Sequence, residues 1–372
     1  MERPSTKPAQ MPPPPTSAPT PPPQAPTRPL TWHVAAPFFQ REDSPWFNLS
    51  PASPHTLRKV PRPTPNEDWH SRGGQSPLSE WGRHNQHAKH VWQQAVADER
   101  SGIVTLFPQL PVLVGIRQRL KRRTDLPVVA WTFNLGKLHG KLQRSVARFA
   151  LKHVDRIIVH STFEVRSYAK WIGWPEDRFT FMPLQRGMIG HLADENEDEP
   201  FILAMGTAKR DYATLGAAAA KLGHRCVIVA GDSAVAGLDL PSNVEVRNGL
   251  SLDECRVLEQ QARVNVVPID NTDTASGQVT VINAMMSGRA VIATDSPGTV
   301  DYLDHEQTGL LAKHRDADDL AQAIDRLWTD APTRNRLGAA ARLQASEHYS
   351  DEAAARNLER VLDEVGRARN LL

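Results

Sequence analysis

Short apolar runs alternate with helix-type segments along most of this 372-residue chain. Strands that alternate with helices in this way are typical of parallel sheets. We therefore predict an α/β protein with two Rossmann-like domains that face each other across a cleft. Ligands in such sheets bind beyond the carboxyl ends of the strands, so the cleft is the expected site. The predicted buried strands are 31–36, 103–107, 128–133, 156–161, 201–205, 226–230, 244–246, 264–268 and 290–293.

Composition sets the expected domain boundaries. The start of the chain is rich in proline, which favours a disordered tail over a packed core. A polar, acidic stretch that ends in a proline lies near the middle of the chain and has the composition of a linker. We predict a disordered Pro-rich tail over 1–30, a first domain over 31–190, an acidic linker over 191–200, a second domain over 201–350 and a C-terminal helix over 351–372.

The most informative segment is a glycine-bounded helix in the second half of the chain. Ser276 and Gly277 end a loop, and apolar residues then repeat at helical spacing, which predicts a helix from about Gln278. The first N–H groups of a helix have no internal partner and its N-terminus is electrically positive, so this end favours a diphosphate. Gly277 permits close approach of the ligand. Gly288 ends the helix, and the strand at 290–293 follows.

A second strand–loop–helix segment precedes it in the sequence, FILAMGTAKRDYATLGAA. Its strand ends at Gly206, and Lys209 and Arg210 stand just before the next helix. The helix dipole disfavours cations at this end, so basic residues here indicate a function. The alternative is that both are ordinary surface residues. We expect Arg210, with Lys209 as its neighbour, to stabilise negative charge on a leaving group.

These two segments resemble the donor-binding region of glycosyltransferase family 4, a class of retaining enzymes with the GT-B fold. The resemblance covers roughly residues 102 to 365. It implies an N-terminal acceptor domain and a C-terminal domain that binds a nucleotide-sugar donor. It also implies transfer of a sugar from a nucleotide diphosphate sugar to a hydroxyl acceptor, in glycan, polysaccharide or glycolipid assembly, with retained configuration and without a metal or another cofactor.

The resemblance further implies roles for individual residues. Asp273 or Thr274 would bind hydroxyls of the sugar, and Asn283 would bind the ribose. Asn134 and His160 follow two strands of the N-terminal domain and are candidates for orienting the reacting sugar. The expected catalytic residues are Arg210, Asp273, Asn134 and His160, and the expected donor-binding residues are Gly206, Lys209, Arg210, Thr274, Ser276, Gly277, Gln278, Val279, Thr280 and Asn283.

Departures from the family pattern leave an alternative function open. Family members usually carry two glutamates around the turn, whereas this chain has Asn283 at the second position and no glutamate at the first. A histidine is also common where Phe133 and Asn134 stand. The alternative is a non-catalytic GT-B paralogue that acts as a nucleotide-sugar binding or regulatory protein.

Charge is divided unevenly between the two halves of the chain. Residues 1–190 hold 26 Lys and Arg against 13 Asp and Glu, and the remaining residues hold 18 against 29. The basic half suits an anionic acceptor, such as a lipid-linked or polysaccharide substrate, or an anionic membrane surface. The acidic half and the lack of an aromatic and basic RNA-binding motif argue against nucleic acid. Attraction between the two domains is the simpler explanation of the asymmetry.

One predicted helix is both basic and amphipathic. We expect it either to lie on an anionic bilayer or to cover its own sheet and point its charge at water. No apolar run approaches the roughly 20 residues of a membrane span, so we expect a cytoplasmic protein, free or peripheral on the inner face of the membrane. The helix carries one stripe of Lys137, Lys141, Arg144, Arg148 and Lys152, and another of Leu138, Leu142, Val146, Phe149 and Ala150.

Overall fold

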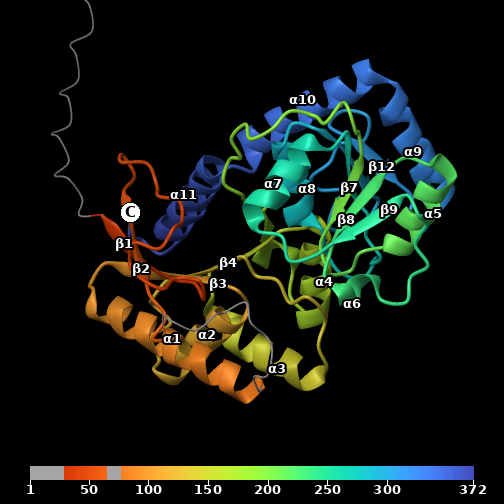
Figure 1. Ribbon diagram of the computed structural model, residues 1–372. Helices are drawn as coiled ribbons and strands as arrows, with labels where there is room; N and C mark the ends of the chain where they lie inside the picture. The colour runs from red at the N-terminus through yellow and green to blue at the C-terminus, as the bar shows by residue number, and fades with distance from the viewer. Residues whose placement is uncertain (1–28, 65–76) are drawn as a thin grey trace, which may run out of the picture.

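The computed structural model describes residues 29–64 and 77–372. Within these residues the chain forms two lobes, each built on a six-stranded sheet whose pairings are all parallel (Figure 1). This architecture confirms the predicted α/β class with two Rossmann-like domains. The predicted proline-rich tail lies almost entirely outside the described residues.

The N-terminal sheet has the strand order β2-β1-β3-β4-β5-β6. Successive residues of a strand face opposite sides of a sheet, so Ile103 packs under α1 to α4 while Val104 packs under α11. The strands are β1 (Leu30–Ala35), β2 (His55–Val60), β3 (Ser101–Leu106), β4 (Val128–Trp131), β5 (Arg156–Val159) and β6 (Phe179–Phe181), and the helices are α1 (Pro77–Ala97), α2 (Gln109–Leu120), α3 (Lys141–Ala150), α4 (Thr162–Ile172) and α11 (Asp351–Ala368).

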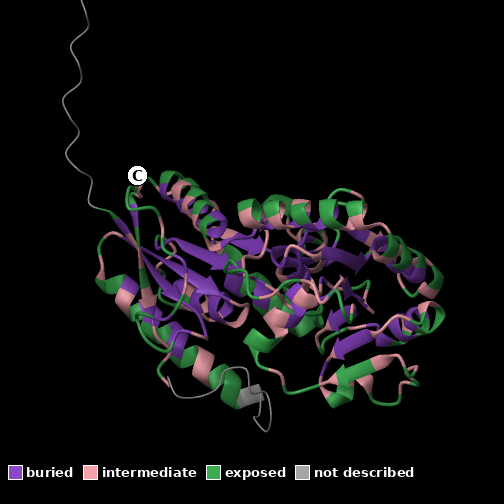
Figure 2. Cartoon of the chain, turned by 45° about the horizontal axis from the view of Figure 1, so that its top comes forward, coloured by how far each residue is buried: buried purple, intermediate pink, exposed green. Residues whose placement is uncertain are grey.

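The C-terminal sheet has the strand order β12-β11-β10-β7-β8-β9. Helices α5 and α9 cover one face and α8 and α10 pack on the other, so the central strands are buried on both sides, while the edge strand β9 is partly exposed (Figure 2). The strands are β7 (Ile202–Met205), β8 (Cys226–Val229), β9 (Val244–Arg247), β10 (Val264–Val267), β11 (Ala290–Thr294) and β12 (Leu310–Ala312), and the helices are α5 (Tyr212–Leu222), α6 (Asp232–Val235), α7 (Leu252–Gln261), α8 (Gln278–Met286), α9 (Ala317–Thr329) and α10 (Ala331–His348).

All nine predicted strands are present, with ends shifted by at most two residues. Three further strands, β2, β6 and β12, escape the sequence analysis. β2 is an edge strand with four polar residues among six, in the sequence HTLRKV, and β6 and β12 are only three residues long. Edge strands and very short strands carry too little apolar sequence to be recognised from a run of buried residues.

The chain's last helix ties the two lobes together. After α10 the chain crosses back, and α11 packs Leu358 and Leu362 against the N-terminal sheet (Figure 1). Beyond α11, Arg369 Nε donates a hydrogen bond of 2.7 Å to Asp155 Oδ1. The first lobe therefore needs the end of the chain to complete its core.

A second connection between the lobes is polar. The carboxylate of Asp301, in the C-terminal lobe, accepts hydrogen bonds from the Ser161 hydroxyl at 2.8 Å and from the Thr162 backbone N–H at 2.8 Å. Ser161 is the N-cap of α4, so a carboxylate of one lobe stabilises a helix start of the other. The neighbouring Tyr302 hydroxyl donates to the carbonyl of His160 at 2.8 Å.

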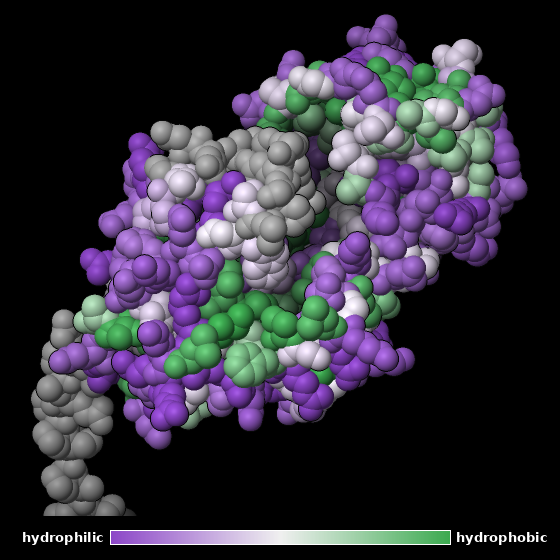
Figure 3. All heavy atoms as spheres, turned by 90° about the horizontal axis from the view of Figure 1, so that it is seen from below, coloured by the Kyte–Doolittle hydropathy of each residue, from purple (hydrophilic) through white to green (hydrophobic). Residues whose placement is uncertain are grey.

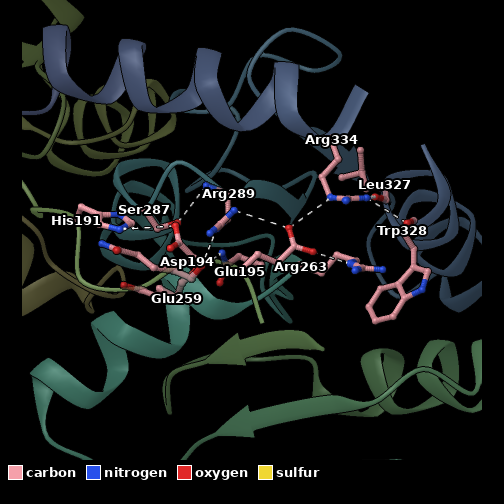
Figure 4. A network of polar contacts seen from close by, with 12 residues as sticks. His191, Asp194, Glu195, Glu259, Arg263, Ser287, Arg289, Leu327, Trp328 and Arg334 are labelled. Carbon is pink, nitrogen blue, oxygen red and sulfur yellow. Dashed lines mark hydrogen bonds and ion pairs between the residues drawn. The ribbon is translucent and has the colours of Figure 1, made fainter. Parts of the chain in front are cut away.

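The acidic segment predicted as a linker contains one carboxylate that is built into the C-terminal lobe. The side chain of Glu195 is only 9% exposed, and its oxygens lie 2.7 Å from Arg263 Nε, 3.7 Å from Arg289 Nη1 and 3.8 Å from Arg334 Nε (Figure 4). Arg263 also stacks its guanidinium over the ring of Trp328. Glu195 thus fixes the start of the second lobe to three arginines from different parts of its sequence.

The structure corrects one of the two expected orientations of the basic helix. This helix is α3, which begins at Lys141, so Lys137 and Leu138 precede it. Its predicted apolar stripe does not cover the sheet, because Leu142 is 74% exposed and Val146 and Phe149 are each 43% exposed. Only the small residues Ala147 and Ala150 of α3 are buried.

Candidate anion-binding site in the C-terminal lobe

The turn at residues 275–277, which we call the phosphate-binding turn after its predicted role, adopts the geometry that the sequence predicts. Gly277 has φ +91° and is the N-cap of α8, which begins at Gln278 as expected. A Cβ atom at Gly277 would lie 2.7 Å from Ile269 Cδ1, so a larger residue would need both a strained backbone and a shifted neighbour. Gly288, with φ +77°, follows the last turn of α8 as predicted.

The start of α8 offers unpaired hydrogen-bond donors. Gly277 has no side chain that could cap the helix, so the backbone N–H groups of Gln278, Val279 and Thr280 have no partner within the helix or from its N-cap. The Ser276 hydroxyl is buried and has no hydrogen-bond partner in the described residues. These donors and the positive end of the helix dipole together form a site that favours an anion.

A further glycine holds the turn in place from the other side. A Cβ atom at Gly298 would lie 2.0 Å from the Ser276 carbonyl oxygen and 2.3 Å from the Ser276 nitrogen. The backbone after β11 therefore packs directly on the phosphate-binding turn. Sequence analysis did not single out Gly298, although an S-P-G sequence after a buried strand is a turn signal.

Arg210 extends from the loop after β7 to the first turn of α8, so the structure joins the two sequence segments. Its Nη2 donates to the Thr280 hydroxyl at 2.7 Å, its Nε to the Met205 carbonyl at 3.0 Å and its Nη1 to the Ala208 carbonyl at 2.8 Å. None of the described carboxylates forms an ion pair with Arg210. Burial lowers the pKa of Arg210, which shows that its charge is poorly solvated.

Gly206 leaves the space that Arg210 occupies. Gly206 has φ +119°, and a Cβ atom there would lie 2.7 Å from Arg210 Nη2. The neighbouring Lys209 is exposed, and its carbonyl accepts a hydrogen bond from the Asp270 N–H at 3.0 Å. Lys209 therefore shapes the loop through its backbone.

Asn283, the residue predicted to hold the ribose, has a partner that the sequence analysis missed. Arg186 Nε donates to Asn283 Oδ1 at 3.1 Å, and the Arg186 backbone N–H donates to the Tyr349 carbonyl at 2.8 Å. Burial lowers the pKa of Arg186, with a further contribution from Arg256. Arg186 comes soon after β6, the short strand that the sequence did not reveal, so its position next to α8 had no sequence signal.

The loop that carries Asp273 and Thr274 is open to solvent. Asp273 is exposed, and its N–H donates to Asn271 Oδ1 at 3.1 Å. The amide of Asn271 donates in turn to the Thr274 carbonyl at 2.7 Å. Among the described residues no hydrogen bond or ion pair joins Asp273 to Arg210 or α8, so its role toward the sugar stays a prediction.

The two candidates from the N-terminal lobe lie apart from this cluster. Asn134 Oδ1 accepts a hydrogen bond of 2.7 Å from the Gly136 N–H and shapes the loop after β4. His160 is buried beside the contact between the lobes, where its Nδ1 donates to the Met182 carbonyl at 2.7 Å. Burial lowers the pKa of His160 to about 4, so its imidazole is neutral. Its Nε2 has no partner in the part of the chain that the structure describes.

The site thus places a half-buried cation, a buried hydroxyl and free helix N–H groups around one turn in the C-terminal lobe. Residues 194–344, which contain this whole cluster, match the family model of glycosyl transferases group 1. The second lobe is a group 1 glycosyltransferase domain. No curated protein sequence matches the chain significantly.

Solved structures show what the glycosyltransferase resembles as a whole. Sucrose-phosphate synthase from Thermosynechococcus elongatus superposes with a TM-score of 0.66 at 17% identity, over 91% of this chain and 99% of that protein. A glycosyltransferase from Rickettsia africae gives 0.60 at 15% identity, over 83% and 85%. Anabaena HepE in complex with UDP-glucose gives 0.58 at 13% identity, over 78% and 84%. These likenesses confirm the GT-B-like fold of both lobes together.

Proposed function

We propose that this glycosyltransferase moves a sugar from a nucleotide diphosphate sugar to a hydroxyl acceptor and that the diphosphate binds at the start of α8. The observation that carries the proposal is Arg210, a half-buried guanidinium without a carboxylate partner among the described residues, which reaches the first turn of α8. A cation that is partly removed from water and has no counterion is disfavoured, and a bound diphosphate would supply the missing negative charge. HepE, one of the similar structures, was solved with UDP-glucose, which makes UDP the first nucleotide to test.

In the proposed reaction the protein acts mainly through electrostatics. The N–H groups of Gln278, Val279 and Thr280 and the guanidinium of Arg210 bind the diphosphate and stabilise the charge that develops as the sugar leaves. Arg210 does not have to reorganise during the step, because its guanidinium is already fixed by three hydrogen bonds.

Recognition of the rest of the donor follows from neighbouring residues. Asn283 contributes its amide nitrogen to the ribose, since only its oxygen is bonded to Arg186. Asp273 or Thr274 receives the sugar hydroxyls, and Asn134 and His160 are the candidates from the N-terminal lobe for orienting the reacting sugar. Retention of configuration follows if the leaving phosphate accepts the proton of the hydroxyl that attacks on the same face of the sugar. Glycan, polysaccharide or glycolipid assembly is the corresponding process.

Release of free nucleotide from UDP-glucose, GDP-mannose and ADP-glucose, with and without candidate acceptors, tests the proposal. We expect release from one of these donors, and a large loss of release in Arg210→Ala at subsaturating donor. Arg360→Ala, which removes an exposed arginine of α11 in the other lobe, is the matched control. Unchanged release in Arg210→Ala would exclude the role of this residue, and nucleotide binding without any release would favour a binding protein.

A further inference from the structure

The largest side chains of α3 are exposed, although they are apolar. Leu142, Val146 and Phe149 are 74%, 43% and 43% exposed. They are four and three residues apart, so they share one face of the helix. Leu120, at the end of α2, is 70% exposed. We call Leu142, Val146 and Phe149 the α3 face.

The way α3 packs on α2 fixes this exposure. A Cβ atom at Gly115 in α2 would lie 2.0 Å from the Ala150 carbonyl oxygen, so the two helices are in backbone contact. Such close contact admits only small residues, here Ala147 and Ala150, which are the buried residues of α3. The larger residues of α3 must therefore point outward. The guanidinium of Arg119 lies 4.1 Å from the centre of the Phe149 ring and holds that ring at the surface.

The surroundings of the α3 face carry a strong positive charge. Asp125 is the single acidic residue between positions 109 and 154, and it pairs with Arg123 at 3.0 Å. Among the described residues no carboxylate pairs with Lys141 or Arg144, which α3 exposes beside the apolar stripe. The ten basic residues of the same segment are Arg117, Arg119, Lys121, Arg122, Arg123, Lys137, Lys141, Arg144, Arg148 and Lys152.

Apolar and basic residues are thus combined on one side of the molecule. Figure 3 views the molecule from the side on which α1, α2 and α3 lie in Figure 1, and it shows a continuous apolar area on the N-terminal lobe with hydrophilic atoms around it. An exposed apolar area with a charged border marks a surface that binds something. None of the helices in the described residues is both long and apolar enough to cross a membrane.

We propose that the α3 face binds an anionic lipid bilayer, with its apolar side chains in the interface and Lys141 and Arg144 at the lipid phosphates. An apolar stripe beside basic residues is the pattern of a helix that lies in the plane of such a surface. A second copy of this chain fits less well, because it would bring two basic surfaces together. A polyanion such as nucleic acid would leave the apolar stripe in water. The inference concerns binding alone and does not depend on the proposed reaction.

Co-sedimentation of the full chain with vesicles tests this inference. We expect binding to vesicles of equal parts phosphatidylglycerol and phosphatidylcholine, and little binding to phosphatidylcholine alone. Each basic residue near an anionic membrane is worth about a fivefold change in partitioning. The charge-reversal variant Lys141→Glu/Arg144→Glu should therefore lower partitioning at least about tenfold, and Leu142→Ser/Phe149→Ser should lower it about tenfold or more because the apolar contact is lost.

Matched substitutions in exposed positions elsewhere serve as controls. Leu343→Ser removes a leucine that is 60% exposed on α10, and Arg360→Glu reverses an exposed charge on α11. Both should bind vesicles as the wild type does. All substitutions are at the surface, and circular dichroism confirms that each variant is folded. Failure of the wild type to bind anionic vesicles would overturn the inference. So would equal binding by the α3 variants, or a change in oligomeric state that depends on the α3 face without vesicle binding.

Discussion

Replacement of Arg210 by methionine separates ligand binding from stability. Methionine keeps much of the side-chain volume but removes the charge and all three hydrogen bonds of the guanidinium. Each of these bonds contributes about 1 kcal/mol to stability. Partial burial of the unpaired guanidinium opposes this stabilisation, because it removes the charge from water and lowers the pKa of Arg210.

These two contributions oppose each other in the free protein. Because the folded-state pKa is below the unfolded value, the charged guanidinium disfavours folding at every pH at which it is charged in the folded state, and the hydrogen bonds offset this penalty. We expect Arg210→Met to change the free energy of unfolding by less than about 2 kcal/mol. For domains of about 200 residues this corresponds to a shift in Tm of a few degrees, at about 2–4 °C per kcal/mol.

Catalysis should respond much more strongly than stability. Loss of one preorganised donor to a developing charge typically costs about 2.7–4 kcal/mol, or a factor of about 10² to 10³ in rate. We expect nucleotide release to fall by this factor in Arg210→Met. Arg210→Lys should give an intermediate rate, because lysine keeps the charge but cannot bridge the Thr280 hydroxyl and two carbonyls in the same way.

The assay is nucleotide release measured beside thermal unfolding for wild type, Arg210→Met and Arg210→Lys. At about 2–4 °C per kcal/mol, the expected change in stability shifts the Tm by well under ten degrees. The reasoning is refuted if Arg210→Met lowers the Tm by about ten degrees or more and leaves the rate per folded molecule unchanged. Arg210 would then be a structural tie between the loop after β7 and α8, and the diphosphate would bind elsewhere.

Three further substitutions test other parts of the account. Gly298→Ala places a Cβ atom 2.0 Å from the backbone of the phosphate-binding turn. Overpacking typically costs about 1–3 kcal/mol, so the nucleotide affinity measured by calorimetry should fall at least about tenfold. Gly82→Ala, which has open space around its Cβ position, should leave the affinity unchanged. Burial raises the pKa of Glu259 from 4.5 to about 7. Between these pH values the folded state keeps a proton that the unfolded state releases, so the free energy of unfolding falls by about 3 kcal/mol as the pH rises. Glu259→Gln should abolish this loss in urea titrations at pH 5 and pH 8. In the same titration, Glu195→Ala should lower the free energy of unfolding by about 3–5 kcal/mol, because it leaves three arginines without their carboxylate. The side chain of Glu199 is 74% exposed, so Glu199→Ala should lower it by less than about 1 kcal/mol.

The sequence predicts the turn at residues 275–277 well because local rules determine it. A helix start, a glycine with positive φ and a buried strand follow from residues close together in the chain, and Gly277, α8 and β11 appear where expected. The proximity of Arg210 to Thr280 joins residues 70 positions apart. The sequence suggests this contact only through the resemblance of both segments to one family.

Other features depend on packing that no local pattern encodes. The orientation of α3 follows from the backbone contact between Gly115 and Ala150, which overrides the preference of leucine and phenylalanine for the interior. Arg186 reaches Asn283 only because the segment after β6 runs beside α8. The buried position of His160 likewise results from Tyr302 and Met182, which belong to other parts of the fold.

The central claim is that a nucleoside diphosphate binds at the start of α8. Thermal unfolding in the presence of UDP, GDP and ADP tests this claim most directly. A ligand that binds only the folded state stabilises it by about 2.7 kcal/mol at a concentration one hundred times its Kd. We predict that one of the three nucleotides raises the Tm of the wild type as its concentration increases, and that Arg210→Met and Gly298→Ala remove most of this rise. If none of the three raises the Tm, or if both variants respond as the wild type does, the anion-binding site described around Gly277 is not the donor site.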